Sequence, residues 1–103
     1  MKEGYIKLPR SIIDDEYFSQ KFTRAQALID LYFLAGYKDK VIFIRGNRVA
    51  VKRGQIAASV RELSDRWHWS KNTVHQFLEW LEEEGKIDIN RSHIINIITI
   101  PFL

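Results

Sequence analysis

Residues 55–89 read QIAASVRELSDRWHWSKNTVHQFLEWLEEEGKIDI, and their spacing predicts two short helices joined by a tight turn. Ser59 and Glu62 match the capping box, in which a hydroxyl caps a helix and a glutamate three residues later reaches back to the cap. The apolar side of this first helix follows the i, i+3, i+4, i+7 spacing of an amphipathic helix: Val60, Leu63, Ser64 and Trp67.

A second capped helix follows after a turn of about four residues. Ser70 caps it, and Gly85 stands where a C′ glycine closes a helix. Its apolar positions repeat the same spacing: Val74, Phe77, Leu78 and Leu81. Residues 86–100 then alternate as a hairpin around the turn Arg91-Ser92-His93. We therefore expect a helix-turn-helix over residues 59–84 and a hairpin, or wing, over residues 86–100.

The first half of the chain predicts one longer helix and a second hairpin. Thr23 caps a helix over residues 24–38, whose apolar positions run nearly all the way round. Such a helix lies either at the centre of a core or under a partner chain. Residues 41–52 hold two β-rich runs, with Gly46-Asn47 as the two-residue turn between them. Ahead of the helix, Tyr5–Leu8 is expected as a short strand or extended arm.

Length and composition exclude several classes of protein. A chain of 103 residues is one domain's worth, and the absence of cysteine excludes disulfides, thiolate zinc sites and cysteine nucleophiles. No apolar run approaches the ~20 residues of a membrane span, and the N-terminus lacks the pattern of a signal peptide. We therefore expect a cytoplasmic protein. Because no phosphate loop, nucleophile elbow or metal-ligand spacing is present, we expect no enzyme activity, cofactor or bound metal.

The net charge of +3 is unevenly distributed along the chain. Residues 1–58 hold 11 Lys and Arg against 6 Asp and Glu, whereas residues 59–103 hold 5 against 7. Residues 38–53, around the first hairpin, carry six of the cations against Asp39 alone, a net charge of +5. This basic segment is either a phosphate-binding surface or a solvated hairpin whose charges keep its strands soluble.

The segment KRGQIAAS over residues 52–59, which leads into the first capped helix, resembles a segment of a known family. It is similar to the K-x-G-Q…S-x-x-x-L region in the N-terminal winged helix of phage and bacterial replication-initiation (replisome-organiser) proteins. That resemblance covers nearly the whole chain, although family members usually continue further. It implies an α+β winged helix-turn-helix with an extra β-hairpin between the first helix and the helix-turn-helix. GntR-type regulators share the pattern of residues 55–89.

The second helix of a helix-turn-helix lies in the major groove, where its N-terminal exposed side chains meet base edges. Asn72 and Gln76 lie one turn apart and carry amides that pair with adenine, while Lys71 can reach phosphate or guanine. The residues expected to contact DNA lie at the start of this helix, in the wing, in the basic hairpin and before the turn: Ser70, Lys71, Asn72, Thr73, His75, Gln76, Arg91, Ser92, His93, Arg45, Arg48, Lys52, Arg53 and Arg61.

Each of these residues also has a plainer interpretation. Ser70 can act only as a cap, Arg61 can pair with Asp65 one turn later, and the wing residues can form an ordinary polar turn. Against DNA binding stands the acidic end of the second helix, which phosphates would repel: Glu79, Glu82, Glu83 and Glu84.

Three functions therefore remain open on the sequence. The first is a duplex-DNA-binding domain of a replication-initiation type protein, with other replication proteins as partners. The second is a transcriptional regulator with a GntR-like reader, which would dimerise on a palindromic site. The third is a protein–protein or self-assembly module. Trp80 lies off the apolar stripe and is expected to pack against the wing or a partner chain, so a homodimer would form through residues 24–38 or Trp80.

Overall fold

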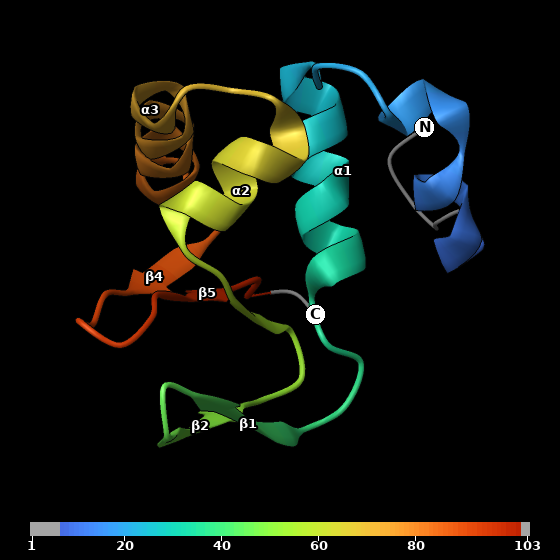
Figure 1. The fold of residues 1–103 in the computed structure, drawn as a ribbon. Coiled ribbons are helices and arrows are strands. Elements are labelled where there is room, and N and C mark those ends of the chain that lie inside the picture. The colour runs from blue at the N-terminus through green and yellow to red at the C-terminus, as the bar shows by residue number, and fades with distance from the viewer. Residues whose placement is uncertain (1–6, 102–103) are drawn as a thin grey trace.

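The computed structural model describes residues 7–101, without the side chain of Tyr17, as an α+β fold (Figure 1). In this range lie three α-helices and two 3-10 helices: η1 (Arg10–Asp14), η2 (Glu16–Phe18), α1 (Arg24–Leu34), α2 (Val60–Trp67) and α3 (Lys71–Glu83). The strands are β1 (Lys40–Ile44), β2 (Asn47–Val51), β3 (Gln55–Ala57), β4 (Asp88–Asn90) and β5 (Ile97–Thr99). The segment expected at Tyr5–Leu8 lies in its first half outside the described residues.

Two separate antiparallel sheets are formed. One is the β1–β2 hairpin, and the other has the strand order β3-β5-β4. Figure 1 shows α2 and α3 on one side of the three-stranded sheet and the β1–β2 hairpin extending from its other side. The 3-10 helices lie beside α1, on the side away from α3.

Each α-helix begins at the hydroxyl cap that the sequence predicts. Ser59 Oγ accepts a hydrogen bond from the Glu62 N–H at 3.0 Å, and the Glu62 carboxylate accepts one from the Ser59 N–H at 3.3 Å. Thr23 makes the same reciprocal pair with Gln26, and Ser70 Oγ accepts from the Thr73 N–H at 3.2 Å. These bonds satisfy amide donors that have no carbonyl partner within the helix.

The end of α3 also agrees with the sequence, which predicts a C′ glycine at Gly85. Gly85 adopts a φ of 75°, and its N–H donates to the Glu82 carbonyl at 3.1 Å. The next N–H, that of Lys86, reaches back to the Leu81 carbonyl at 2.9 Å. This pair of bonds is the Schellman motif, which needs a left-handed residue and so favours glycine. The motif turns the chain directly into β4.

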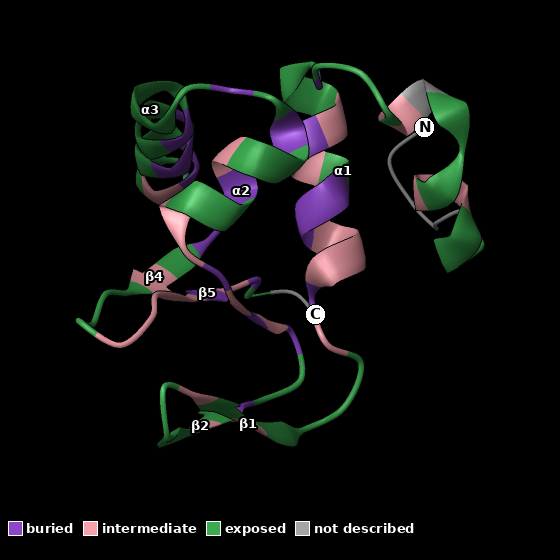
Figure 2. Ribbon diagram, in the orientation of Figure 1, coloured by how far each residue is buried: buried purple, intermediate pink, exposed green. Residues whose placement is uncertain are grey.

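The predicted apolar stripes of α2 and α3 form the centre of the core, as the buried faces in Figure 2 show. Trp67 is completely buried, and its ring makes edge-to-face contacts with Trp69 at 5.1 Å and Phe77 at 5.9 Å between centroids. Trp69 and Phe77 also touch each other, at 5.2 Å. This aromatic cluster fixes the angle between the two helices, because edge-to-face pairs have a preferred geometry.

One charged side chain lies in the middle of this core. Asp30 of α1 is fully buried and accepts three hydrogen bonds. Arg66 donates through Nε to Oδ2 at 2.6 Å and through Nη2 to Oδ1 at 2.8 Å. The indole N–H of Trp67 donates to Oδ2 at 2.8 Å. A buried carboxylate is tolerated only when it is paired in this way, so the group joins α1 to α2.

The helix predicted over residues 24–38 ends at Leu34, which corrects its C-terminal boundary. Ala35 is already extended, and the N–H of Gly36 donates to the Gln55 carbonyl at 3.2 Å. In return the Gly54 N–H donates to the Gly36 carbonyl at 2.8 Å. This exchange with a segment almost twenty residues away ends the helix early.

The turn of the first hairpin is Arg45-Gly46, whereas the sequence predicted Gly46-Asn47. Ile44 pairs with Asn47, so only Arg45 and Gly46 lie between the strands. Their φ angles of 49° and 80° are both positive, as the tight turn favoured by hairpins requires. The Asn47 side-chain amide donates to the Ile44 carbonyl at 3.2 Å and thereby supports the turn from its edge.

The wing is shorter than predicted, and it pairs with a strand that the sequence did not reveal. Its second strand begins at Ile97, where the prediction began at Ile94. The Ser92 hydroxyl accepts hydrogen bonds from the N–H groups of Ile94 and Ile95, both at 3.2 Å, which holds these residues in a local turn. β5 also pairs with β3, so that Ile56 faces Ile98 across the ladder.

We predict that Asp30→Ala lowers the free energy of unfolding by about 3 kcal/mol, because the buried indole N–H of Trp67 loses its acceptor and Arg66 its ion pair. Urea denaturation followed by tryptophan fluorescence measures the change. Asp65→Ala is the matched control: it removes a carboxylate that is exposed on α2 and should change stability by less than about 0.5 kcal/mol. Equal losses in the two variants would contradict a structural role for Asp30.

Candidate nucleic-acid interface

The outward face of α3 carries the polar residues expected to read DNA, and these are exposed: Lys71, Asn72, Thr73, His75 and Gln76. Glu79, of the acidic end, is exposed on the same helix. The apolar residues between them are buried, so the helix separates the two sets as its spacing predicts. Because Asn72 and Gln76 are four residues apart, their amides extend from the same side of the helix.

Ser70 already makes two hydrogen bonds at the start of α3. Its hydroxyl accepts from the Thr73 N–H and lies 2.8 Å from the Thr73 hydroxyl. The N–H groups of Lys71 and Asn72 have no carbonyl within the helix to bond, as at every helix start. Together with the positive end of the helix dipole, they favour an anion at this terminus.

Two cations that the sequence analysis missed flank this face. Lys21, three residues before α1, and Arg24, its first residue, line a hollow of about 210 Å³ together with Thr73 and Gln76 of α3. The hollow is completed by Phe22, Trp69, Phe77 and Trp80. Trp69 connects the turn before α3 to the segment before α1, because its indole N–H donates to the Phe22 carbonyl at 2.8 Å. No local signal in the sequence places residues 21–24 beside α3.

Trp80 packs against the start of α1, whereas we expected it against the wing or a partner chain. The guanidinium carbon of Arg24 lies 4.6 Å from the centroid of its ring, a cation–π distance. The indole remains 37% exposed. The off-stripe side chain therefore makes at least one contact within this chain, between α3 and α1.

Arg91, the first residue after β4 in the wing turn, is bound by the acidic end of α3. Its guanidinium donates from Nη2 to Glu82 Oε1 at 3.0 Å and from Nη1 to Oε2 at 3.3 Å. These bonds lower the pKa of Glu82 and raise the pKa of Arg91, and the charge of Glu79 adds to the second effect. The pair offsets one of the four acidic charges that would otherwise repel phosphate.

The rest of the wing tip is a local turn. Ser92 is occupied by its bonds to Ile94 and Ile95, and it also donates to the Ile95 carbonyl at 2.9 Å. His93 is exposed beside it. Of the three wing residues expected to contact DNA, two therefore already make hydrogen bonds inside the chain.

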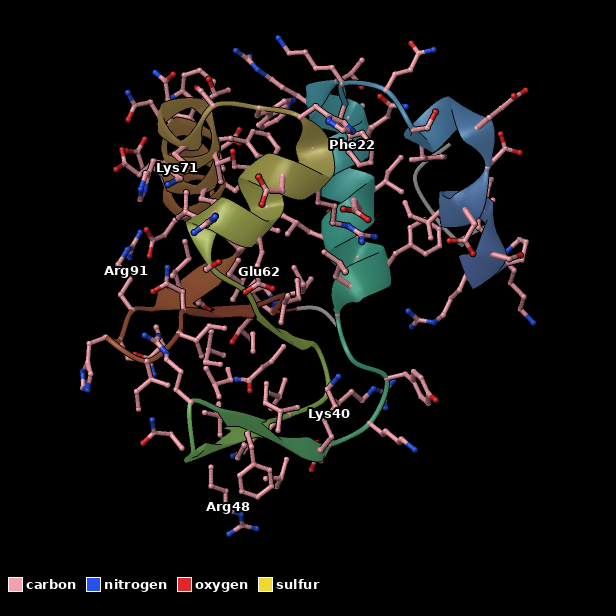
Figure 3. All side chains as sticks on the ribbon, in the orientation of Figure 1. Phe22, Lys40, Arg48, Glu62, Lys71 and Arg91 are labelled. Atoms are coloured by element: carbon pink, nitrogen blue, oxygen red, sulfur yellow. The ribbon has the colours of Figure 1, made fainter. Side chains whose placement is uncertain are left out.

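The basic hairpin reaches the wing through its tip. Arg45 Nη2 donates to the Ile94 carbonyl at 2.8 Å, across 49 positions of sequence. Arg48 lies elsewhere, and Figure 3 shows it at the far end of the molecule from Lys71. Lys52 and Arg53 are exposed after β2, and the Arg53 N–H is bound by the Asp39 carboxylate at 2.8 Å. The hairpin cations thus do not all share one surface with α3.

Arg61 is exposed on α2 and free of the partner we considered for it. Within residues 7–101 the ion pairs are Arg66 with Asp30 and Arg91 with Glu82, so Arg61 and Asp65 do not pair. The same range holds no cluster of three His, Asp or Glu side chains suited to a metal ion. None of its helices has the length and apolar character needed to cross a membrane.

Comparison with known proteins finds no protein family, curated protein or solved structure that matches this chain.

We predict that Arg91→Gln raises the pKa of the Glu82 carboxyl, because the hydrogen bonds that favour its charged form are lost. The pair stabilises the fold above the ordinary pKa of glutamate, and this contribution disappears as the pH falls through the lowered value. Carboxyl NMR titration measures the shift. Lys71→Gln, which removes an equal charge at the other end of α3, should leave Glu82 unchanged. The same titration curve in the Arg91 variant and the parent chain would rule the pair out in solution.

Proposed function

We propose that this chain is a winged-helix domain that binds double-stranded DNA, as part of a replication-initiation type protein. The observation that carries the proposal is the exposed polar face at the start of α3, flanked by Lys21 and Arg24. In this proposal the first two turns of α3 enter the major groove. Asn72 and Gln76 meet base edges, and Lys71 binds a phosphate or a guanine.

The order of elements supports the assignment to the winged-helix class. Two capped helices with a three-residue connection, residues 68–70, are followed by a hairpin that starts directly at the Schellman turn of the second helix. β3 directly precedes α2 in the chain, and it joins the same sheet by pairing with β5. The replication role itself rests on the resemblance of residues 52–59.

The acidic end of α3 is compatible with entry by the N-terminus. A helix of 13 residues is about 20 Å long, so Glu83 lies far from Lys71. Glu82 is paired with Arg91, which reduces the repulsion where the helix meets the wing. Phosphates on either side of the groove would meet Lys21 and Arg24 near α1, and Arg45 and His93 near the wing.

We expect duplex binding with a steep dependence on salt. Neutralising about five phosphates gives a slope near −4.5 in a plot of log K against log salt concentration. Fluorescence anisotropy of a labelled duplex, titrated between about 50 and 200 mM salt, measures it. A flat slope, or no duplex binding at the lower concentration, would contradict the proposal.

Two substitutions separate affinity from sequence preference. Lys71→Ala should weaken binding to all duplexes and reduce the size of the slope by about 1. Asn72→Ala should relax the preference at one base position, by about 1–3 kcal/mol. Lys86→Ala, an exposed cation beyond the C-terminus of α3, is the matched control and should change neither quantity. A transcriptional reader would instead bind as a dimer to half-sites one helical turn apart, which ultracentrifugation with a palindromic duplex detects.

A further inference from the structure

We propose that the outer face of the β1–β2 hairpin is a second nucleic-acid site, which binds single strands by stacking an unpaired base on Phe43. This site goes beyond the proposed duplex binding by α3, because it uses different residues and a different form of nucleic acid. The proposal begins from the exposure of the ring. Phe43 is 72% exposed, the highest value among the large hydrophobic side chains of the described residues.

The strand register decides which residues share the outer face. Phe43 is paired with Arg48, and Val41 with Ala50. Directly paired side chains lie on one face, with Cβ atoms about 5 Å apart. All four residues of this face are exposed, whereas Ile42 and Val49 on the opposite face are partly buried and Val51 is buried. Figure 2 shows much of this hairpin as exposed. The fold therefore does not use the Phe43 ring to fill a core.

Charge around this face favours an anionic partner. Residues 38–53 carry a net charge of +5, while the whole chain carries +3. Arg48 stands directly opposite Phe43, and Lys40 and Lys52 lie at the open end of the hairpin. The one acidic residue of the segment, Asp39, is occupied by the Arg53 N–H. A second copy of the same hairpin would be repelled by this charge, so self-association through the face is disfavoured.

The other exposed aromatic rings of the described residues already have cations over them. Arg10 lies 5.3 Å and Lys38 5.7 Å from the ring centre of Tyr37, and Arg24 lies over Trp80. Within residues 7–101 no such contact covers Phe43. Its face is therefore available to a flat partner from outside the chain.

An exposed ring with a cation beside it on the same face, in a segment of net positive charge, matches the general chemistry of single-strand binding. Aromatic side chains stack on bases of any type, and Lys and Arg follow the phosphates. In a duplex both faces of a base are already stacked on its neighbours, so the ring would gain nothing from it. Binding that depends on the ring, and not only on the charge, is therefore diagnostic of an unpaired base.

The test measures the affinity of the intact chain for labelled oligo(dT) of 12 nucleotides by fluorescence anisotropy at low salt. Phe43→Ala should weaken this binding about tenfold, which corresponds to ~1.4 kcal/mol and lies within the range for stacking one base. Phe43→Trp should retain or strengthen it. Arg48→Ala should lower the size of the salt slope by about 0.7, the value for one phosphate of a single strand. Tyr37→Ala is the matched control and should bind as the parent chain does.

Three results would overturn the proposal. One is unchanged oligo(dT) affinity in Phe43→Ala. Another is a Phe43→Trp variant as weak as the alanine variant, which would show that the ring only supports the hairpin. The third is full competition by polyglutamate at equal charge, which would point to an acidic peptide as the occupant.

Duplex binding serves as the independent readout. Phe43→Ala should keep its duplex affinity, and Lys71→Ala should keep its oligo(dT) affinity. If the chain binds oligo(dT) through Phe43 but fails to bind duplex, the α3 proposal fails and the hairpin proposal stands. If the chain binds duplex but not oligo(dT), the reverse holds.

Discussion

The arrangement of the helices depends on the buried carboxylate of Asp30. It accepts hydrogen bonds from Arg66 and from the indole of Trp67, so α1 can take only an orientation that brings both donors to one carboxyl group. Apolar packing alone permits several rotations of a helix, whereas an unpaired buried charge is strongly unfavourable. Because the indole of Trp67 also contacts Trp69 and Phe77, the constraint extends from α1 through α2 to α3.

This same chain of contacts assembles the candidate site. The Phe22 N–H donates to the Trp67 carbonyl at 3.0 Å, and the Trp69 indole donates to the Phe22 carbonyl. These two bonds hold the start of α1 against the turn between α2 and α3. Lys21 and Arg24 therefore come to lie beside Thr73 and Gln76, although about fifty residues separate them in sequence.

The features that the sequence predicted correctly are local ones. Helix caps and the glycine that ends α3 depend on hydrogen bonds between residues three to five apart, so their spacing is visible in the sequence. The errors lie where distant segments meet. α1 ends at Leu34 because Gly36 forms a hydrogen bond with Gln55. β3 forms because it pairs with β5, where Ile98 lies opposite Ile56. The position of Lys21 and Arg24 beside α3, and the pairing of Arg91 with Glu82, depend on the same kind of long-range contact. A carboxylate within an otherwise apolar helix, as at Asp30, indicates that a hydrogen-bond partner lies elsewhere in the chain.

These contacts decide where charge remains available on the surface, and the net charge of +3 does not show this. Most of the acidic residues lie in the second half of the chain, where Arg91 pairs with Glu82 of α3. Asp39, the single acid of the basic segment, binds a backbone amide and stays beside the hairpin cations. Arg45 donates a hydrogen bond to the wing, whereas Arg48 is paired with Phe43 and lies beside its exposed ring. Since Arg48 and Lys71 lie far apart (Figure 3), a single straight duplex lying along α3 would not cover both. The positive charge of the hairpin therefore needs an explanation separate from that of α3, and an exposed ring at its centre favours an unpaired strand.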